Sequence, residues 1–380
     1  MKVTIAIDSL KGSLSSLDAG HAIENGILHV YPDAEIHVRP LADGGEGTVE
    51  ALTFGMGGTM QTITVTGPLG EPVTAQYGII DDSIAVMEMA QAAGITLIPK
   101  DKRNPLNTTT YGVGEMILDA IARGCRKFIV GIGGSATNDG GIGMLQALGY
   151  QFLNNDGVSI DWGAKGLKDL VSINTEQVIP ELAHCSFRIA CDVNNPLCGP
   201  LGASAVYGPQ KGATPDMIQD MDLWLNHFAE IASKVNSKSD ATAAGAGAAG
   251  GLGFAFSSFT NAVLESGISI VLDETKLEYY IKNSDLIVTG EGRLDEQTAM
   301  GKAPIGVASI AKKYNKTVLA FAGCINKNAK VCNAHGIDAY FPILRNIVTL
   351  DEALEKETAK NNMTETVEQV FRLIKATRNL

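Results

Sequence analysis

The sequence lacks the features of several large protein classes. Its net charge of −12 leaves no excess of Lys and Arg to hold a nucleic-acid backbone, so we expect no nucleic-acid partner. No uninterrupted apolar run is long enough to cross a bilayer. The N-terminal MKVTIAIDS enters a strand pattern without the long apolar core of a signal peptide. We therefore expect a cytoplasmic protein without a membrane partner; the sequence leaves its oligomeric state open.

Metal, redox and nucleotide motifs of the standard kinds are also missing. The six cysteines form no close Cys-x-x-Cys pair, and the six histidines show no metal-ligand spacing. No glycine loop ends in the Gly-Lys-Ser/Thr of a Walker A motif, and the first strand is not followed by a three-glycine dinucleotide fingerprint. Any site must therefore be inferred from less common arrangements.

The chain length and its patterns predict two domains. At 380 residues the chain exceeds the size at which a single core usually stops growing. Both ends alternate strands with helices, as in a parallel sheet, whereas the middle opens with antiparallel hairpin patterns. We predict a discontinuous Rossmann-like α/β domain with a parallel sheet, formed by residues 1–60 and 284–380. Residues 61–283 then form an inserted second α/β domain with a mixed sheet and glycine-rich loops.

Several helices can be placed from periodicity and capping. Ser15 followed by Asp18 resembles a capping box at a helix start. Apolar spacing predicts further helices over residues 110–123, 216–235 and 351–376. The small-residue stretch ATAAGAGAAGGLG, from position 241, has the composition of a flexible linker. Because it carries almost no charge and leads into several phenylalanines, we favour a packed loop.

The stretch GIGGSATNDGGIG, from position 131, joins a predicted strand to a predicted helix start. Glycines there let the backbone approach a ligand closely, and a helix N-terminus with hydroxyl and amide side chains favours phosphate. Taken alone, the motif is equally compatible with a structural glycine turn. The residues that we assign to phosphate binding are Gly133, Gly134, Ser135, Thr137 and Asn138.

Polar side chains also gather where three strands of the outer domain are predicted to end. Lys11 and Arg293 can neutralise a carboxylate or phosphate, and carboxylate oxygens are ligands that Mg²⁺ accepts. The clusters are Asp8, Ser9 and Lys11, then Asp43 and Glu46, then Glu291, Arg293 and Asp295. We assign Ser9, Lys11, Asp43 and Arg293 to substrate binding, and Asp43, Glu46 and Asp295 to the metal.

Asp192 is the candidate general base. It follows a predicted strand, where a carboxylate beside a phosphate site can accept the proton of a substrate hydroxyl. Asp192 can equally cap the turn at the strand end, and Asp43 and Asp295 compete for the role of base. We assign Asp192 as catalytic together with Lys11 and Arg293.

Six short sequence motifs, taken in order over nearly the whole chain, resemble those of the bacterial type I glycerate kinase family. The motifs are DSLKGSLS, PLADGGEGT, GIGGSATNDGG, ACDVNNPLCG with GPQKGATP, GAGAAGGLG and DLIVTGEGRLDEQTAMGKAP. Leu10 departs from the Phe expected in the first motif, an apolar exchange. The resemblance implies ATP-dependent phosphorylation of D-glycerate to 2-phosphoglycerate, with 3-phosphoglycerate as the alternative product. We therefore expect ATP and Mg²⁺ as cofactors.

Two other functions are alternatives to a glycerate kinase. An NAD-dependent oxidoreductase of a small hydroxy acid requires a glycine fingerprint after the first strand, where this chain has only Gly12. A two-domain small-anion binding protein normally carries an export signal, which we do not find.

Overall fold

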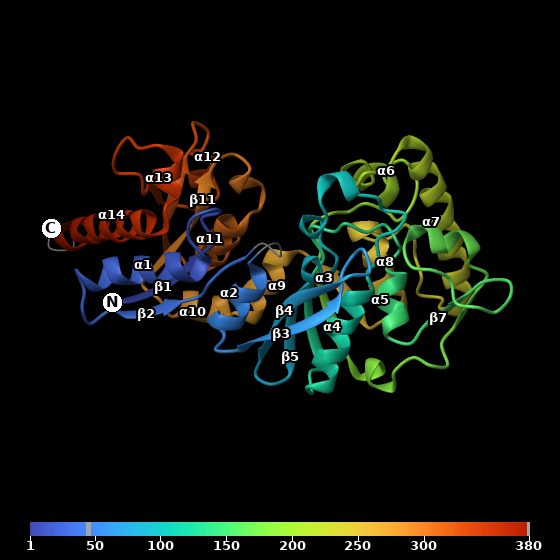
Figure 1. Cartoon of the computed structure of the whole chain (residues 1–380). Helices are drawn as coiled ribbons and strands as arrows, with labels where there is room; N and C mark the ends of the chain where they lie inside the picture. The colour runs from blue at the N-terminus through green and yellow to red at the C-terminus, as the bar shows by residue number, and fades with distance from the viewer. Residues whose placement is uncertain (43–46, 378–380) are drawn as a thin grey trace. The chain divides into compact units, whose positions relative to one another are not determined.

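The computed structural model describes residues 1–42 and 47–377, which divide into two compact units (Figure 1). Residues 1–42, 50–57 and 268–377 form the first unit, and residues 47–49 and 58–267 form the second. Each unit has an apolar core of its own. Our prediction extends the insert to residue 283, whereas the structure places residues 268–283 in the first unit. Helix α10 (Leu277–Lys282) there packs against α11 and β1 of the first unit's fold.

The first unit is built on a fully parallel five-stranded sheet, as predicted. The strand order is β13-β12-β11-β1-β2. From β1 the chain crosses to β2 on one side, and from β11 it crosses to β12 on the other. Open α/β sheets bind ligands at the carboxyl ends of their strands where the order reverses in this way. The strands are β1 Lys2–Ile7, β2 Glu35–Val38, β11 Leu286–Leu294, β12 Thr317–Ile325 and β13 Ala339–Pro342.

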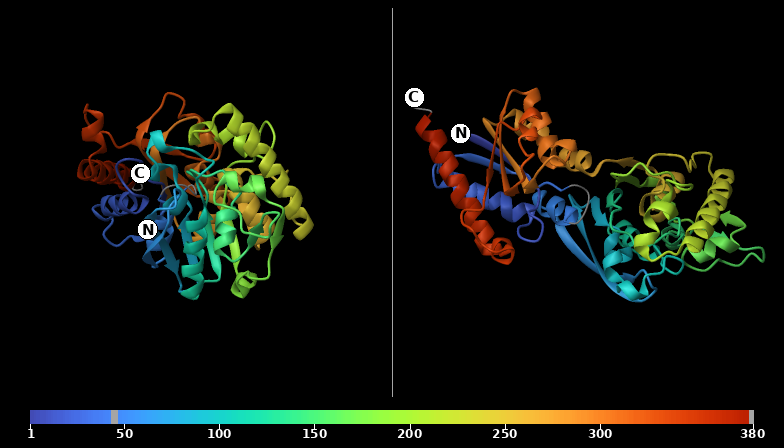
Figure 2. Two further views of the ribbon diagram at one scale, coloured as in Figure 1. Left: turned by 45° about the vertical axis from the view of Figure 1, so that its right-hand side comes forward. Right: turned by 90° about the horizontal axis from the view of Figure 1, so that it is seen from above.

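Helices cover this sheet. α1 and α14 pack beside each other, blue and red in Figure 2, although they lie at opposite ends of the sequence. The Ser15 hydroxyl caps α1 by accepting a hydrogen bond from Asp18 N, which confirms the predicted start. The helices are α1 Ser16–Leu28, α2 Thr48–Gly55, α9 Gly267–Glu274, α10, α11 Ala303–Lys313, α12 Val331–Ala334, α13 Leu350–Leu354 and α14 Lys356–Thr377.

The closing helix is divided, where we predicted one continuous helix over 351–376. Glu355 has an extended backbone conformation between α13 and α14. Its carboxylate accepts hydrogen bonds from the backbone N–H groups of Glu357 and Thr358, so it caps the first turn of α14. Apolar periodicity continued across this residue and concealed the break.

Within the part of the chain that the structure describes, no helix has the length and apolar character needed to cross a membrane.

The second unit has a six-stranded mixed sheet in the order β10-β9-β6-β5-β4-β3. β3, β4 and β5 pair in antiparallel fashion, as predicted, and β5, β6, β9 and β10 pair in parallel. The carboxyl ends of the parallel strands therefore share one edge. The strands are β3 Thr59–Thr66, β4 Pro72–Ile80, β5 Ile84–Glu88, β6 Lys127–Gly131, β9 Ser186–Ala190 and β10 Ala262–Glu265, with a separate pair β7 Gln151–Leu153 and β8 Ser172–Asn174.

The helices of this unit include two that match their predicted spans closely, α4 and α7. The glycine- and alanine-rich stretch after α7 is largely buried, which confirms a packed loop over a flexible linker. Ala249, Gly250 and Gly251 there all have positive φ angles, which accounts for the glycines. The helices are α3 Ala90–Ala93, α4 Tyr111–Ala122, α5 Ile142–Ala147, α6 Ala203–Tyr207, α7 Pro215–Val235 and α8 Leu252–Phe259.

Candidate active site

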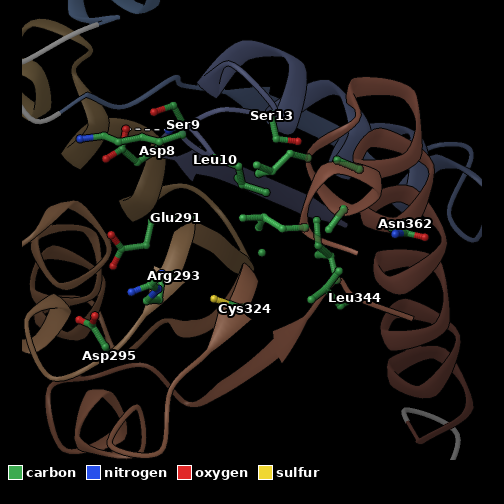
Figure 3. A pocket seen from close by; sticks show the side chains of 18 of the residues that line it. Asp8, Ser9, Leu10, Ser13, Glu291, Arg293, Asp295, Cys324, Leu344 and Asn362 are labelled. Atoms are coloured by element: carbon green, nitrogen blue, oxygen red, sulfur yellow. Dashed lines mark hydrogen bonds between the residues drawn. The ribbon is translucent and has the colours of Figure 1, made fainter. Parts of the chain in front are cut away.

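A cavity of about 490 Å³ lies at the carboxyl edge of the first unit's sheet (Figure 3). The carboxyl ends of β11 and β12 line it, together with the loops after β1, β11 and β13 and the helices α13 and α14. What we call the charged end holds three carboxylates and three cations: Asp8, Glu291, Asp295, Lys11, Arg293 and Lys302. What we call the apolar end is formed by Leu10, Ile343, Leu344, Leu350, Ala353 and Leu354.

The pairing of β1 with β11 brings the first and last polar motifs together. Ile7 lies opposite Gly290 in the parallel register, and Asp8 N donates a hydrogen bond to Gly290 O at 3.0 Å. A Cβ atom on Gly290 would lie 1.8 Å from the carbonyl oxygen of Phe321 in β12, so only glycine fits here. Residues nearly 300 positions apart therefore share one cavity, and Ser9, Lys11, Arg293 and Asp295 are among its lining residues.

Glu291 is a buried acid at the charged end, with 8% of its surface exposed. Burial raises the pKa of Glu291, against the opposing effects of a hydrogen bond from the Thr298 hydroxyl and of the Lys302 ammonium. Lys302 Nζ lies 3.8 Å from Glu291 Oε2. A carboxyl group with a raised pKa in a cavity is a candidate for proton exchange with a ligand.

The predicted metal ligands are only partly described. Asp43 and Glu46 lie outside the described residues. Asp295 Oδ1 accepts hydrogen bonds from Gln297 N at 2.9 Å and Thr298 N at 3.2 Å, so Asp295 caps the turn that follows β11. Among the residues described, no three His, Cys, Asp or Glu side chains form a metal-binding group. Mg²⁺ usually takes one or two carboxylates and completes its shell with water and phosphate, so the carboxylates of the charged end fit it in kind.

The glycine loop after β6 lies in the second unit. It does not begin a helix where we predicted one. Helix α5 begins at Ile142, after a loop whose Ser135, Thr137 and Asn138 side chains are buried. Asn138 Nδ2 donates to Ser204 Oγ at 2.9 Å, so this side chain holds the loop from within. These three residues therefore do not form a helix N-terminus.

Gly133 and Gly134 form the exposed part of the same loop. Gly134 has a φ of +73°, a backbone conformation that residues with a side chain rarely adopt. A Cβ atom on Gly133 would meet no atom within 4 Å. The backbone at these two positions is therefore open enough for a ligand to approach closely, as we predicted from the glycines.

Lys211, from the GPQKGATP motif, is a residue that sequence reasoning missed. It is fully enclosed in the second unit, and its Nζ donates to Ser135 Oγ at 2.9 Å and to Thr137 O at 2.6 Å. Burial lowers the pKa of Lys211 to about 7, and nearby Asp139 acts in the opposite direction. Lys211 thus fixes the glycine loop from its inner side. The only signal in the sequence was a lysine between Pro209 and Gly212.

Asp139 supports the loop at its far end. Burial raises the pKa of this carboxyl group, while hydrogen bonds from Thr110 and from the N–H groups of Gly141 and Gly143 act to lower it. Asp139 Oδ2 accepts from Thr110 N at 2.9 Å and from Thr110 Oγ1 at 2.8 Å. The loop is therefore held by buried polar contacts on both sides of Asn138.

Asp192 follows β9 in the second unit and is exposed. Its Oδ1 accepts a hydrogen bond at 3.1 Å from the N–H group of Gly267, the first residue of α9. This contact joins Asp192 to a distant segment of the chain, so it tests neither the predicted cap of the turn after β9 nor the predicted role as a base. The cavity of Figure 3 is lined by first-unit residues, so the predicted catalytic and binding residues are distributed over both units.

Comparison with known proteins identifies the family of this chain. Residues 3–375 match the model of the glycerate kinase family. The chain belongs to the glycerate kinase family. A glycerate kinase of Haemophilus influenzae is 48% identical over 98% of this chain and 99% of the relative. The glycerate 2-kinase of Escherichia coli K12 is 49% identical over 93% of each chain.

A solved structure extends the likeness to the fold. The crystal structure of a Salmonella typhimurium LT2 protein, provisionally assigned as glycerate kinase 2, superimposes with a TM-score of 0.93. The two chains are 46% identical and each is covered completely. Membership of the glycerate kinase family confirms the resemblance seen in the sequence, and neither alternative function gains support. The members of this family are phosphotransferases with an alcohol acceptor, and phosphoryl transfer depends in general on positioned positive charge.

Proposed function

We propose that the chain transfers the γ-phosphoryl group of ATP to the 2-hydroxyl of D-glycerate, giving 2-phosphoglycerate. The observation that carries this proposal is the charged end of the cavity, where Lys11, Arg293 and Lys302 are gathered beside carboxylates. The Escherichia coli relative, named a glycerate 2-kinase, supports the choice of hydroxyl. Transfer to the 3-hydroxyl is the competing outcome.

Lys11 and Arg293 act in this proposal by neutralising charge. Arg293 presents a planar fork that suits a carboxylate or phosphate, and Lys11 acts as a point charge. Phosphoryl transfer depends mainly on positioning and charge neutralisation, so these groups contribute directly to the rate. Ser9, beside Lys11, is proposed to hydrogen-bond the substrate, and Asp43, outside the described residues, remains a proposed substrate and metal ligand.

A magnesium ion would be held by Asp295, Asp43 and Glu46 together with phosphate oxygens, and would neutralise phosphate charge. Asp295 already uses Oδ1 for capping, so its part in this shell would rest on Oδ2.

In the second unit, we assign Asp192 as the base that accepts the proton of the attacking hydroxyl. Glu291 competes for this role, because its raised pKa makes it a better proton acceptor than an ordinary exposed carboxylate. The exposed backbone of Gly133 and Gly134 supports a contact with a phosphate group, while Ser135, Thr137 and Asn138 keep that backbone in place.

A coupled ADP-release assay tests the proposal. The purified full chain with ATP and Mg²⁺ is offered D-glycerate, L-glycerate, glycolate and lactate, and the product is analysed by phosphorus NMR. We expect ADP release with D-glycerate and a product phosphorylated at carbon 2. A product phosphorylated at carbon 3 corrects the regiochemistry, and no ADP release above the rate without acceptor refutes the proposal.

A further inference from the structure

We propose that the apolar end of the first unit's cavity is the subsite for the adenine base of ATP, and that Asn362 contacts the polar edge of the base. The inference rests on the proposed function, which makes ATP the phosphoryl donor. It assigns base recognition to the first unit, leaving no base-binding task for the glycine loop of the second.

The size of the cavity requires a ligand larger than the acceptor. Cavities of about 300–1,000 Å³ typically hold drug-sized ligands, and this cavity measures about 490 Å³. Glycerate is a small, fully polar anion whose carboxylate and hydroxyl groups suit the charged end. It leaves the apolar end unused, because aliphatic side chains offer such a molecule no partner.

Aliphatic walls from three segments form the apolar end. Leu10 follows β1, Leu344 follows β13, and Leu354 belongs to α13. Figure 3 shows Leu344 on the side of the cavity away from Asp8, Glu291 and Arg293, with Leu10 between them. Leu344 is 40% exposed, so a flat ring placed against it removes aliphatic surface from water, which is favourable.

Polar groups without partners are present at the same end. Asn362, on α14, lines the cavity and is half-buried, and its side chain forms no hydrogen bond within the described part of the chain. Its carboxamide presents a donor and an acceptor side by side, which is the pattern that adenine's edge complements. Ser13 Oγ also lines the cavity and is buried without a hydrogen-bond partner among the described residues.

The opposite end of the cavity suits the polyphosphate of the same ligand. Lys11, Arg293 and Lys302 supply positive charge, and Lys302 is also the N-cap residue of the eleven-residue helix α11. The cavity lies where the strand order reverses, the usual position of nucleotides in open α/β sheets. An apolar slot with an unpaired amide at one end and cations at the other matches a nucleotide more closely than a hydroxy acid.

Two variants with matched controls test the subsite. Asn362→Leu removes the amide, and Asn361→Leu makes the same exchange at an exposed position of the same helix. Leu344→Glu places a charge in the slot, and Leu373→Glu places one at a leucine of α14 that is 62% exposed and does not line the cavity. The full-length proteins are compared for the KM of ATP, the KM of D-glycerate, and inhibition by adenosine and by inorganic tripolyphosphate.

We expect Asn362→Leu and Leu344→Glu to raise the KM of ATP by about tenfold or more, as the loss of hydrogen bonds or of an apolar contact implies. Adenosine should inhibit these variants less than it inhibits the parent chain. Inhibition by tripolyphosphate and the KM of D-glycerate should stay the same as in the parent chain. Both control variants should match the parent chain. An unchanged KM of ATP, or a rise confined to the KM of D-glycerate, overturns the inference.

Failure of the proposed function is recognised separately. If the parent chain phosphorylates no acid, equilibrium dialysis with labelled ATP still compares the parent chain with the same four variants. Reduced ATP binding in Asn362→Leu and Leu344→Glu then supports the subsite although the acceptor was wrong. Equal binding in all five proteins refutes it.

Discussion

Lys211 should make the stability of the second unit rise with pH near neutrality. The pKa of Lys211 is lowered by burial to about 7, from an ordinary value of 10.5. Between these values the unfolded chain holds a proton that the folded chain has lost, so raising the pH favours the folded state. Below pH 7 both states are protonated and this dependence disappears.

The size of the effect follows from the shift. Each pH unit well inside the window contributes about 1.4 kcal/mol, and the onset is gradual near the folded pKa, so stability should increase by roughly 1.5 kcal/mol from pH 7 to pH 8.5. The measurement should stop at pH 8.5, because thiols begin to contribute above it. Burial raises the pKa of several thiols, and that of Cys198 rises from 9.0 to about 12. A raised thiol pKa stabilises the fold below pH 9 and loses this contribution above it, which would oppose the lysine.

Lys211→Met isolates the contribution of the amine. The variant keeps the aliphatic length but cannot titrate, and it leaves Thr137 O and Ser135 Oγ without their donor. We expect its free energy of unfolding to be about 1–3 kcal/mol below that of the parent chain at pH 8.5, with a smaller difference at pH 6.5, where burying a charged lysine is costly. Urea unfolding monitored by circular dichroism at several pH values measures both curves. Parallel curves for the two proteins would refute the reasoning.

Three further predictions concern the candidate site. Asp192→Asn should lower kcat by roughly 10²- to 10⁴-fold if Asp192 is the base, whereas a capping role alone should cost about 1 kcal/mol of stability with near-normal turnover. Lys11→Met and Arg293→Met should each raise the KM of ATP or glycerate or lower kcat, and parent-like steady-state kinetics in both would remove them from the site. Gly133→Val should fold normally, because the position is open, yet weaken ATP binding at least about tenfold if its backbone meets phosphate. Calorimetric titration with ATP decides this last case, and unchanged affinity would leave the loop a structural role only.

The sequence predicted most of the architecture because the two sheets carry different patterns. Strand and helix alternation at both chain ends indicated the parallel sheet, and hairpin turns after residue 66 indicated the antiparallel strands. The junction at Glu355 was missed, since a single capping carboxylate interrupts the helix without disturbing its apolar spacing. Local signals of this kind are weaker than periodicity summed over several turns.

The candidate site could be predicted only where its residues lie at the carboxyl ends of strands or directly after them. Lys11 and Arg293 could be proposed together because parallel strands end at one edge of a sheet. Asn362 and Lys211 belong to a helix and a loop, and only the tertiary fold brings them to a cavity and to the glycine loop. The Ser135 to Asn138 segment was misread because its polar residues suit a helix cap, whereas buried contacts with Lys211 and Ser204 determine their conformation.

The glycine loop has a consequence for the order in which this protein folds. Gly140 N donates a hydrogen bond to Gly250 O at 2.9 Å, and a Cβ atom on Gly250 would lie 2.0 Å from Thr137 O, so two backbones separated by more than a hundred residues are in direct contact. Neither segment can reach its final conformation until the other has arrived. Contacts between distant parts of a chain carry a large loop-closure entropy and form late. We therefore expect the loop at residues 133–141 to reach its final conformation only after the segment around Gly250 has been synthesised, so this loop should be among the last parts of the second unit to fold.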